Sequence, residues 1–209
     1  SWDANKVADD SRWVYGRPPE RNANYAWIQH ILSKLSPAGV AAVITSRSCG
    51  AEVQKWCSDI KAGILRDNRL ECIIALPSNL FSNTNVGCNL WILSRNKERR
   101  TTRAQDILFV DASALGEKIS PSKYTLTESL IHRIVNKYRA WKNGENYCDE
   151  TDFCRSVPLE EVKQHSFLLQ PSRYVVSSKN SDFEASELLT GYQRCSSKIE
   201  QSALGDQIE

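Results

Sequence analysis

Apolar residues recur at helical spacing in two stretches of the first third of the chain. The first stretch begins at Asn22 and ends at the breaker Ser36-Pro37-Ala38-Gly39, and its apolar side is formed by Trp27, Ile28, Ile31, Leu32 and Leu35. The second stretch predicts a helix over residues 51–66, with a buried side formed by Val53, Trp56, Cys57, Ile60 and Ile64.

Unbroken apolar runs predict four strands, at residues 40–44, 70–76, 88–93 and 107–110. Apolar residues at successive positions are typical of strands buried on both faces of a sheet. The loop over residues 77–87 is too short for a helical crossover, so we expect the strands that it joins to be antiparallel neighbours. The alternation of helices and strands predicts an α/β fold.

The chain beyond Asp111 is expected to be helical. Thr125-Leu126-Thr127-Glu128 has the pattern of a capping box. The helix that it begins has an apolar stripe formed by Leu130, Ile131, Ile134, Val135 and Tyr138. A short helix is expected over residues 158–165, followed by an extended segment over 167–176.

The last residues of the chain also have a helical pattern. Apolar residues spaced alternately by three and four positions predict a helix with a seam, formed by Ala185, Leu188, Tyr192, Cys195 and Ile199. This helix either packs against its own domain or docks a partner helix. We therefore expect three parts: residues 1–115 with the strands, 116–176 as a helical region, and 177–209 as a helical tail.

Composition excludes several classes of protein. The net charge is only +2, so a contact with DNA depends on local basic patches. The longest apolar runs have about five residues, whereas a membrane helix needs roughly 20. The start, Ser1-Trp2-Asp3, does not have the pattern of a signal peptide. The chain contains no methionine, which favours a fragment or a processed chain.

The cysteines and histidines do not predict a metal site. None of the seven cysteines forms a C-x-x-C pair, and His30, His132 and His165 are far from them in the sequence. We expect the cysteines to be reduced and to pack as small hydrophobic residues, which favours a cytoplasmic setting.

Short sequence blocks carry a resemblance to a known family. In chain order they are Asp10-Ser11-Arg12-Trp13, Tyr15-Gly16, Pro18-Pro19, Asn22-Ala23-Asn24-Tyr25-Ala26-Trp27-Ile28-Gln29-His30, Leu35-Ser36-Pro37-Ala38-Gly39, Leu70-Glu71-Cys72-Ile73-Ile74-Ala75-Leu76-Pro77, Asn79-Leu80-Phe81, Leu90-Trp91-Ile92-Leu93, Ile107-Leu108-Phe109-Val110-Asp111-Ala112 and Pro171-Ser172-Arg173-Tyr174-Val175. Together they resemble the modification subunits of type I restriction–modification systems, which are N6-adenine DNA methyltransferases.

The resemblance implies a fold and an activity. It covers about residues 2–176 and implies the C-terminal half of a Rossmann-like, S-adenosylmethionine-dependent methyltransferase sheet, mixed, with antiparallel last strands, plus C-terminal helices. The implied activity of the parent subunit is methyl transfer from S-adenosylmethionine to adenine N6 in DNA. The implied partners are a specificity subunit, which reads sequence, and a restriction subunit, which cleaves.

The motifs that perform this chemistry in the family are not found in the sequence. Pro18-Pro19 stands between Arg17 and Glu20, so it is not the family's Asn/Asp-Pro-Pro-Phe/Tyr tetrapeptide, and no glycine-containing turn follows a predicted strand. We therefore expect no catalytic residue here, and we expect the fragment alone to be inactive. The stretch over residues 45–51 also departs from the Asn-Gly-Ser pattern of the family.

Phe81 is the main candidate for substrate contact. A base that is methylated must leave the duplex and needs an aromatic surface to stack on. The resemblance implies that Phe81 supplies this surface, but a phenylalanine in a polar loop is either exposed for stacking or folded back into the core. Asn79 precedes it in the same loop and is a candidate neighbour of the pocket. Asn22 and Asn24 either cap the first helix or lie near the pocket.

A basic run follows the third predicted strand and consists of Arg95, Lys97, Arg99, Arg100 and Arg103. Guanidinium groups suit phosphate oxygens, so the run either contacts DNA or is ordinary solvated surface. Two other functions stay open for the chain as a whole. It is either a non-catalytic scaffold that binds the specificity subunit or an unrelated α/β protein that binds nucleic acid.

Overall fold

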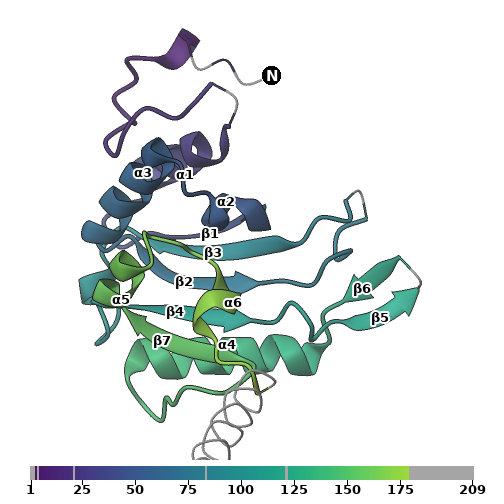
Figure 1. The fold of residues 1–209 in the computed structure, drawn as a ribbon. Helices are drawn as coiled ribbons and strands as arrows, with labels where there is room; N and C mark the ends of the chain where they lie inside the picture. Colours follow the sequence, from purple (N-terminus) through teal and green to yellow (C-terminus); the bar gives the residue numbers. More distant parts are fainter. Residues whose placement is uncertain (1–2, 4, 21, 83, 121, 179–209) are drawn as a thin grey trace, which may run out of the picture. The chain divides into compact units, whose positions relative to one another are not determined.

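A five-stranded mixed sheet forms the centre of this computed structural model, which describes residue 3 and residues 5–20, 22–82, 84–120 and 122–178 (Figure 1). Its strand order is β1-β3-β2-β4-β7. The strands are β1 (Val40–Ser46), β2 (Leu70–Ala75), β3 (Cys88–Ser94), β4 (Asp106–Asp111) and β7 (Cys154–Pro158).

The register confirms the expected antiparallel pairing of the two strands that the 77–87 loop joins. β3 is antiparallel to β1 and to β2, with Trp91 opposite both Val43 and Ile73. β4 is parallel to β2, and β7 is antiparallel to β4. The mixed α/β fold with antiparallel strands is therefore as the sequence predicted.

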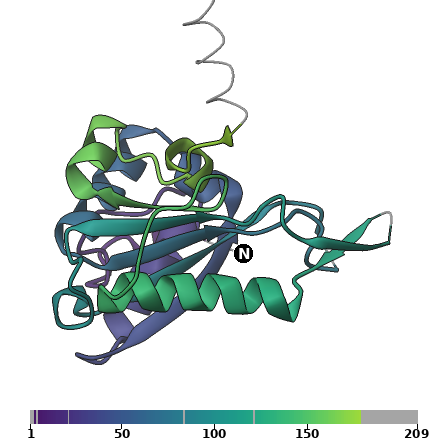
Figure 2. The same ribbon diagram turned by 90° about the horizontal axis from the view of Figure 1, so that it is seen from below.

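Helices cover both faces of the sheet (Figure 2). On one face lie α1 (Asn24–Lys34), α3 (Lys55–Arg66), α5 (Leu159–Gln164) and α6 (Pro171–Tyr174), whose buried side chains form a core cluster with Ile73 and Trp91. On the other face lies α4 (Glu128–Asn143), which packs on a second cluster around Cys72 and Ile74. Alternate residues of the central strand β2 thus enter opposite cores, and all six are buried.

The burial expected for β1 on both faces is wrong. β1 is the first strand in the sheet order, and only β3 pairs with it among the described strands. Val40 and Ile44 are 40% and 52% exposed on the side facing away from α1. An edge strand at the end of a covered sheet alternates in burial even where every residue is apolar.

Several helix boundaries also differ from the expectation. A short helix, α2 (Arg47–Ala51), precedes α3, and Val53 lies exposed between them instead of on a buried stripe. The cap of α4 is Thr127, whose hydroxyl accepts a hydrogen bond from the Leu130 N–H, and not Thr125. The segment over 167–176 is not purely extended, since it contains α6.

Residues 116–176 are not purely helical. They contain the hairpin β5 (Glu117–Ser120) and β6 (Lys123–Thr125) as well as β7 of the main sheet. Strand β7 places Val157 in one core and Cys154 in the other, which explains why this short segment joins the sheet. The described elements belong to a compact unit, Ser1–Val175. The expected helical tail lies outside the described residues from residue 179 onward.

Candidate functional site

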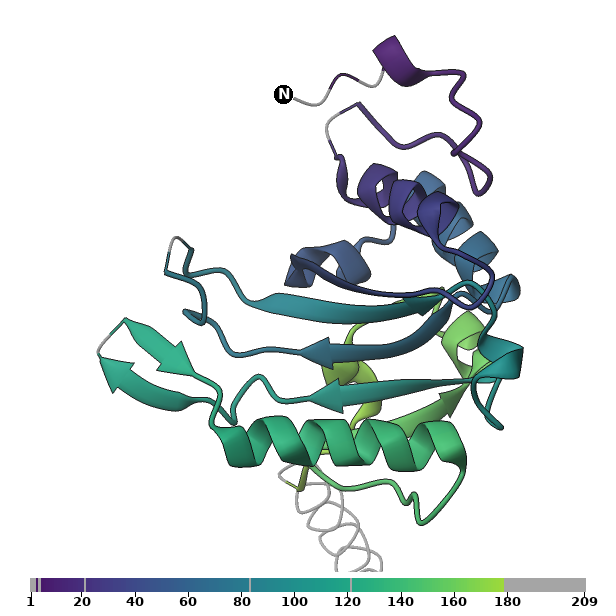
Figure 3. The ribbon, with the colours of Figure 1, turned by 180° about the vertical axis from the view of Figure 1, so that it is seen from behind.

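The carboxyl ends of three strands meet at one edge of the sheet. β1 and β2 are both antiparallel to β3 and so run in the same direction, and β4 is parallel to β2. The segments that leave this edge are α2, the 77–87 loop and the β5–β6 hairpin (Figure 3). In open α/β sheets, ligands bind outside the carboxyl ends of the strands, so a binding site is expected at this edge.

The 77–87 loop holds Phe81 outside the two cores. Phe81 is half-buried and belongs to neither core cluster of the described residues. Asn79 has a positive φ of 57°, a conformation that asparagine tolerates better than most residues. Its carbonyl accepts a hydrogen bond of 3.0 Å from the Tyr124 N–H of the hairpin. The loop is thus attached to the hairpin beside it. Stacking of a base on Phe81 stays a prediction.

Two buried polar residues that were not predicted from the sequence lie just inside this edge. Thr45 and Asn89 face each other across β1 and β3. Asn89 is fully buried, and its amide atoms and the Thr45 hydroxyl have no hydrogen-bond partner among the described residues. A signal was present, because an asparagine inside an apolar strand is unusual unless its polar atoms are needed.

Asn22 organises the start of α1. Its Oδ1 accepts a hydrogen bond of 3.0 Å from the Asn24 N–H, and its Nδ2 donates one of 2.7 Å to Glu52. The residue at the cap position itself is Ala23, which makes no side-chain cap. Asn22 therefore satisfies a free N–H of the helix, as expected, and also links α1 to the segment that follows α2. A place for Asn22 and Asn24 near the pocket stays a prediction.

The basic run lies at the opposite edge of the sheet from Phe81. β3 is antiparallel to β1 and β2, so the residues that follow it leave at the amino ends of those strands. β2 has six residues, which places the two edges about 20 Å apart.

Four of the five basic side chains make contacts within the protein, including Arg95, whose Nη1 donates a hydrogen bond of 3.3 Å to the Leu32 carbonyl. Lys97 is only 2% exposed, and its ammonium group donates to the Asp106 carbonyl. Burial lowers the pKa of Lys97 to about 8. The Arg100 Nε lies 2.8 Å from Oε1 of the buried Glu71. The expectation of a phosphate contact is therefore wrong for Lys97, because its side chain points inward.

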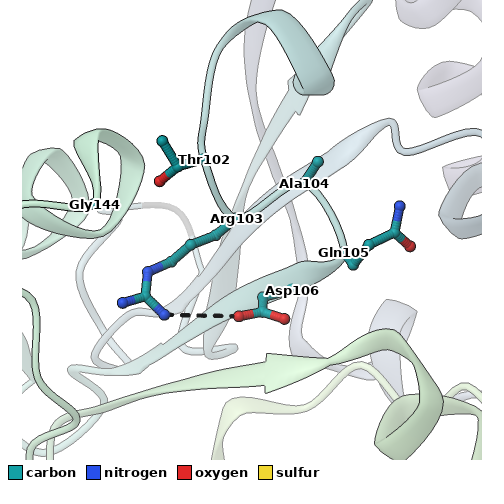
Figure 4. Close-up of a pocket in the computed structure, with 6 residues that line it drawn as sticks. All are labelled: Thr102, Arg103, Ala104, Gln105, Asp106 and Gly144. Atoms are coloured by element: carbon teal, nitrogen blue, oxygen red, sulfur yellow. Dashed lines mark ion pairs between the residues drawn. The ribbon is translucent and has the colours of Figure 1, made fainter.

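Arg103 borders an open cavity of about 490 Å³, which is lined by Thr102, Arg103, Ala104, Gln105, Asp106 and Gly144 (Figure 4). Its guanidinium pairs with Asp106 at 3.8 Å and lies 5.0 Å from the centre of the Tyr147 ring. Arg95 and Arg99 are the two members of the run with exposed side chains.

The described residues show neither a metal site nor a membrane-spanning helix. They contain no group of three histidine, cysteine or acidic side chains that could hold a metal ion. No helix among them is long and apolar enough to cross a membrane. The cysteines of this part of the chain are free thiols, buried except for Cys148.

Comparison with known proteins decides the family. The sequence model of the family described as N-6 DNA Methylase matches residues 1–183. The chain belongs to the N-6 DNA methylase family. It is 36% identical over 181 residues to the type I restriction enzyme HindI methylase subunit of Haemophilus influenzae. It is 31% identical over 184 residues to the type I restriction enzyme MjaIX methylase subunit of Methanocaldococcus jannaschii.

A solved structure supports the fold of this family member. The type I restriction-modification system methyltransferase subunit from Streptococcus thermophilus superposes with a TM-score of 0.72 at 26% sequence identity, over 83% of this chain and 35% of that one. The matches to the H. influenzae and M. jannaschii subunits cover 87% and 83% of this chain but 40% and 32% of those proteins. The chain thus spans less than half the length of these relatives.

Proposed function

We propose that this chain is the carboxy-terminal portion of the methyltransferase subunit of a type I restriction–modification system. The complete subunit would methylate adenine N6 in DNA, within a cytoplasmic complex that also holds a specificity subunit and a restriction subunit. The observation that carries the proposal is the family match over residues 1–183, combined with the position of the Phe81 loop at the carboxyl edge of the sheet.

The outer edge of β1 supports the proposal that the complete subunit adds a further strand to this sheet. Its backbone pairs on one side only among the described strands, and Val40 and Ile44 remain exposed beside it. Proteins usually protect such an apolar edge, because it promotes association with other chains. A further strand of the complete subunit would pair with β1 and cover these side chains.

The described residues do not fit the usual cradle of S-adenosylmethionine, which is a glycine-containing turn from a strand into a helix. The nearest glycine to this pattern is Gly50 within α2, where a Cβ would lie 2.2 Å from the Leu169 carbonyl oxygen. Cofactor binding is therefore assigned to the rest of the subunit. This chain's part in the reaction is to hold the extruded base in place, which contributes to catalysis through position and orientation.

Replacing Phe81 with alanine in the complete complex should weaken binding of the extruded adenine by about 5- to 150-fold, because base stacking on an aromatic ring contributes about 1–3 kcal/mol. Fluorescence titration with duplexes that carry 2-aminopurine at the target adenine measures this loss. Binding of S-adenosylmethionine, measured separately by calorimetry, should be unchanged.

Val86→Ala is the matched control, since Val86 is an apolar residue of the same loop and is 57% exposed. We expect it to leave base binding as it is in the wild type. Equal affinities of wild type, Phe81→Ala and Val86→Ala would refute the stacking role.

For DNA phosphate contacts, we retain only Arg95 and Arg99 of the basic run. Changing both to glutamine should reduce the slope of log K against log salt concentration by about 2, since each phosphate contact contributes about 0.9. Lys55→Gln, at an exposed position of α3, is a control for the general loss of charge. An unchanged slope in the double variant would mean that the run is ordinary surface.

The absence of the family's catalytic tetrapeptide from this sequence favours a second function for the chain on its own, a non-catalytic scaffold that binds the specificity subunit. A pull-down of the 209-residue chain with that subunit tests the scaffold function, and a methylation assay on the captured material tests where the cofactor binds. Capture without methyl transfer supports a scaffold. Methyl transfer by the captured chain would contradict the assignment of cofactor binding to the rest of the subunit.

A further inference from the structure

We propose that Arg47 is a positioning residue that closes the base of the 77–87 loop and so sets the place of Phe81. The closing of the loop is a property of this chain, whereas its consequence for the base rests on the proposed function. Arg47 lies in the stretch over residues 45–51 that departs from the family pattern, so no role is carried over to it by resemblance.

Arg47 bonds to both ends of the loop. Its backbone N–H donates a hydrogen bond of 2.9 Å to the carbonyl of Gly87, the last residue of the loop. Its Nη2 donates one of 3.1 Å to the carbonyl of Leu76, the residue that precedes the loop. One residue at the carboxyl end of β1 therefore holds the point where the loop leaves β2 and the point where it enters β3.

Gly87 packs directly against the Arg47 guanidinium. A Cβ at position 87 would lie 2.8 Å from the Arg47 Cζ and 2.9 Å from its Nε. Gly87 is buried, and its φ is not in the left-handed region, so glycine is not required there by backbone conformation. A residue with a Cβ therefore fits at position 87 only if the Arg47 guanidinium moves away.

The start of the loop has a second attachment, to the β5–β6 hairpin. The Asn79 carbonyl accepts the Tyr124 N–H at 3.0 Å, and a Cβ on Gly116 would lie 2.7 Å from the Pro77 Cγ, so the hairpin base packs against the start of the loop. Phe81 follows Asn79 by two residues, so it lies in the loop between this attachment and the Gly87 end that Arg47 holds. Fixing both ends of a loop removes conformations in which the ring would be misplaced.

Hydrogen exchange in the 209-residue chain tests the closing of the loop directly. We expect Arg47→Ala to speed exchange of the loop amides by about tenfold, the loss expected for one hydrogen bond, while the amides of β2 and β4 keep their protection. The Arg47 backbone bond to Gly87 is kept in this variant, so the change isolates the guanidinium. Arg47→Lys, which retains a donor for the Leu76 carbonyl, should give an intermediate rate.

Arg69→Ala is the matched control, because the Arg69 Nη1 also donates to a backbone carbonyl, that of Arg95, at the opposite edge of the sheet. Its loop exchange should equal that of the wild type. Gly87→Ala offers an independent route, since its methyl group displaces the guanidinium. In a protein that already carries Arg47→Ala, Gly87→Ala should raise the exchange rate of the loop amides little further. Unchanged loop exchange in Arg47→Ala, or full additivity of the two changes, would overturn the proposal.

Base binding in the complete complex distinguishes this inference from the proposed function. We expect Arg47→Ala to lower affinity for the 2-aminopurine duplex, less than additively with Phe81→Ala, and to leave S-adenosylmethionine binding unchanged. If Phe81→Ala weakens base binding and Arg47→Ala does not, the positioning role is refuted. If neither does, while loop exchange still rises in Arg47→Ala, the stacking function fails and the closing of the loop stands.

Discussion

Replacing Glu71 with alanine should lower the free energy of unfolding by about 3–5 kcal/mol, the range observed when one partner of a buried ion pair is removed. The Glu71 side chain is 0% exposed on β2. Its Oε1 accepts a hydrogen bond of 2.8 Å from the Arg100 Nε, and its Oε2 accepts one from the hydroxyl of Tyr138 on α4. The carboxylate thus joins the sheet, the loop after β3 and the covering helix.

The loss is large because the partners stay where they are. Without Glu71, the Arg100 guanidinium and the Tyr138 hydroxyl would remain partly buried with unsatisfied donors. Lys97 lies in the same region, and the nearby Glu71 charge partly counteracts the effect of burial on the Lys97 pKa. Removing the carboxylate would leave two cations with less compensation.

Urea denaturation of wild type and Glu71→Ala measures the effect. The control is Glu160→Ala, which removes an exposed carboxylate that pairs with Lys163 and should cost less than about 1 kcal/mol. Glu71→Ala combined with Arg100→Ala should recover part of the loss, because it removes one of the unpaired cations. A loss below about 1 kcal/mol for Glu71→Ala would show that water reaches these groups.

The strands were predictable because their signal is local. Residues 70–76 and 88–93 were expected as buried strands, and β2 and β3 lie there as antiparallel neighbours. The burial of β1 was not predictable in the same way, because its apolar run resembles that of a central strand. Whether a strand lies at an edge depends on its neighbours, and these are fixed by the whole chain.

The hairpin and β7 carried weaker signals. β5 is a polar strand exposed at every position, and β7 is short, with polar residues between its buried ones. Neither has the apolar run from which strands were predicted. Both are defined by pairing, β5 with β6 and β7 with β4, and pairing between distant segments leaves little trace in one sequence.

The candidate site was predictable in part. The position of Phe81 in a loop beside the sheet followed from the chain order. The separation of the basic run from that loop did not, because it depends on β3 lying antiparallel to its neighbours. That Lys97 points inward and Arg99 outward also could not be deduced, since a run of charges does not show which side chains turn back toward the core.

Gly50→Ala should lower the free energy of unfolding by about 2–3 kcal/mol, although alanine favours a helix over glycine by about 1 kcal/mol. The added Cβ would lie 2.2 Å from the Leu169 carbonyl oxygen and 3.0 Å from its carbon. The backbone of Leu169 is itself held by a hydrogen bond of 2.9 Å from its N–H to the Gly50 carbonyl. Two backbones in direct contact have no side chain that could rotate away, so the segment must shift.

The shift would spread into the core, because Leu169 is fully buried and the same segment leads into α6, where Tyr174 stacks on Phe109 with ring centres 4.3 Å apart. Gly63→Ala in α3 is the matched control, because its Cβ would meet a side chain, that of Tyr15 at 2.7 Å, instead of a backbone. We expect urea denaturation to show a change within about 1 kcal/mol for Gly63→Ala and the larger loss for Gly50→Ala. Equal stability of the two variants would mean that the segment after α5 adapts freely, and that its contact with α2 contributes little to holding the helix at the end of β1.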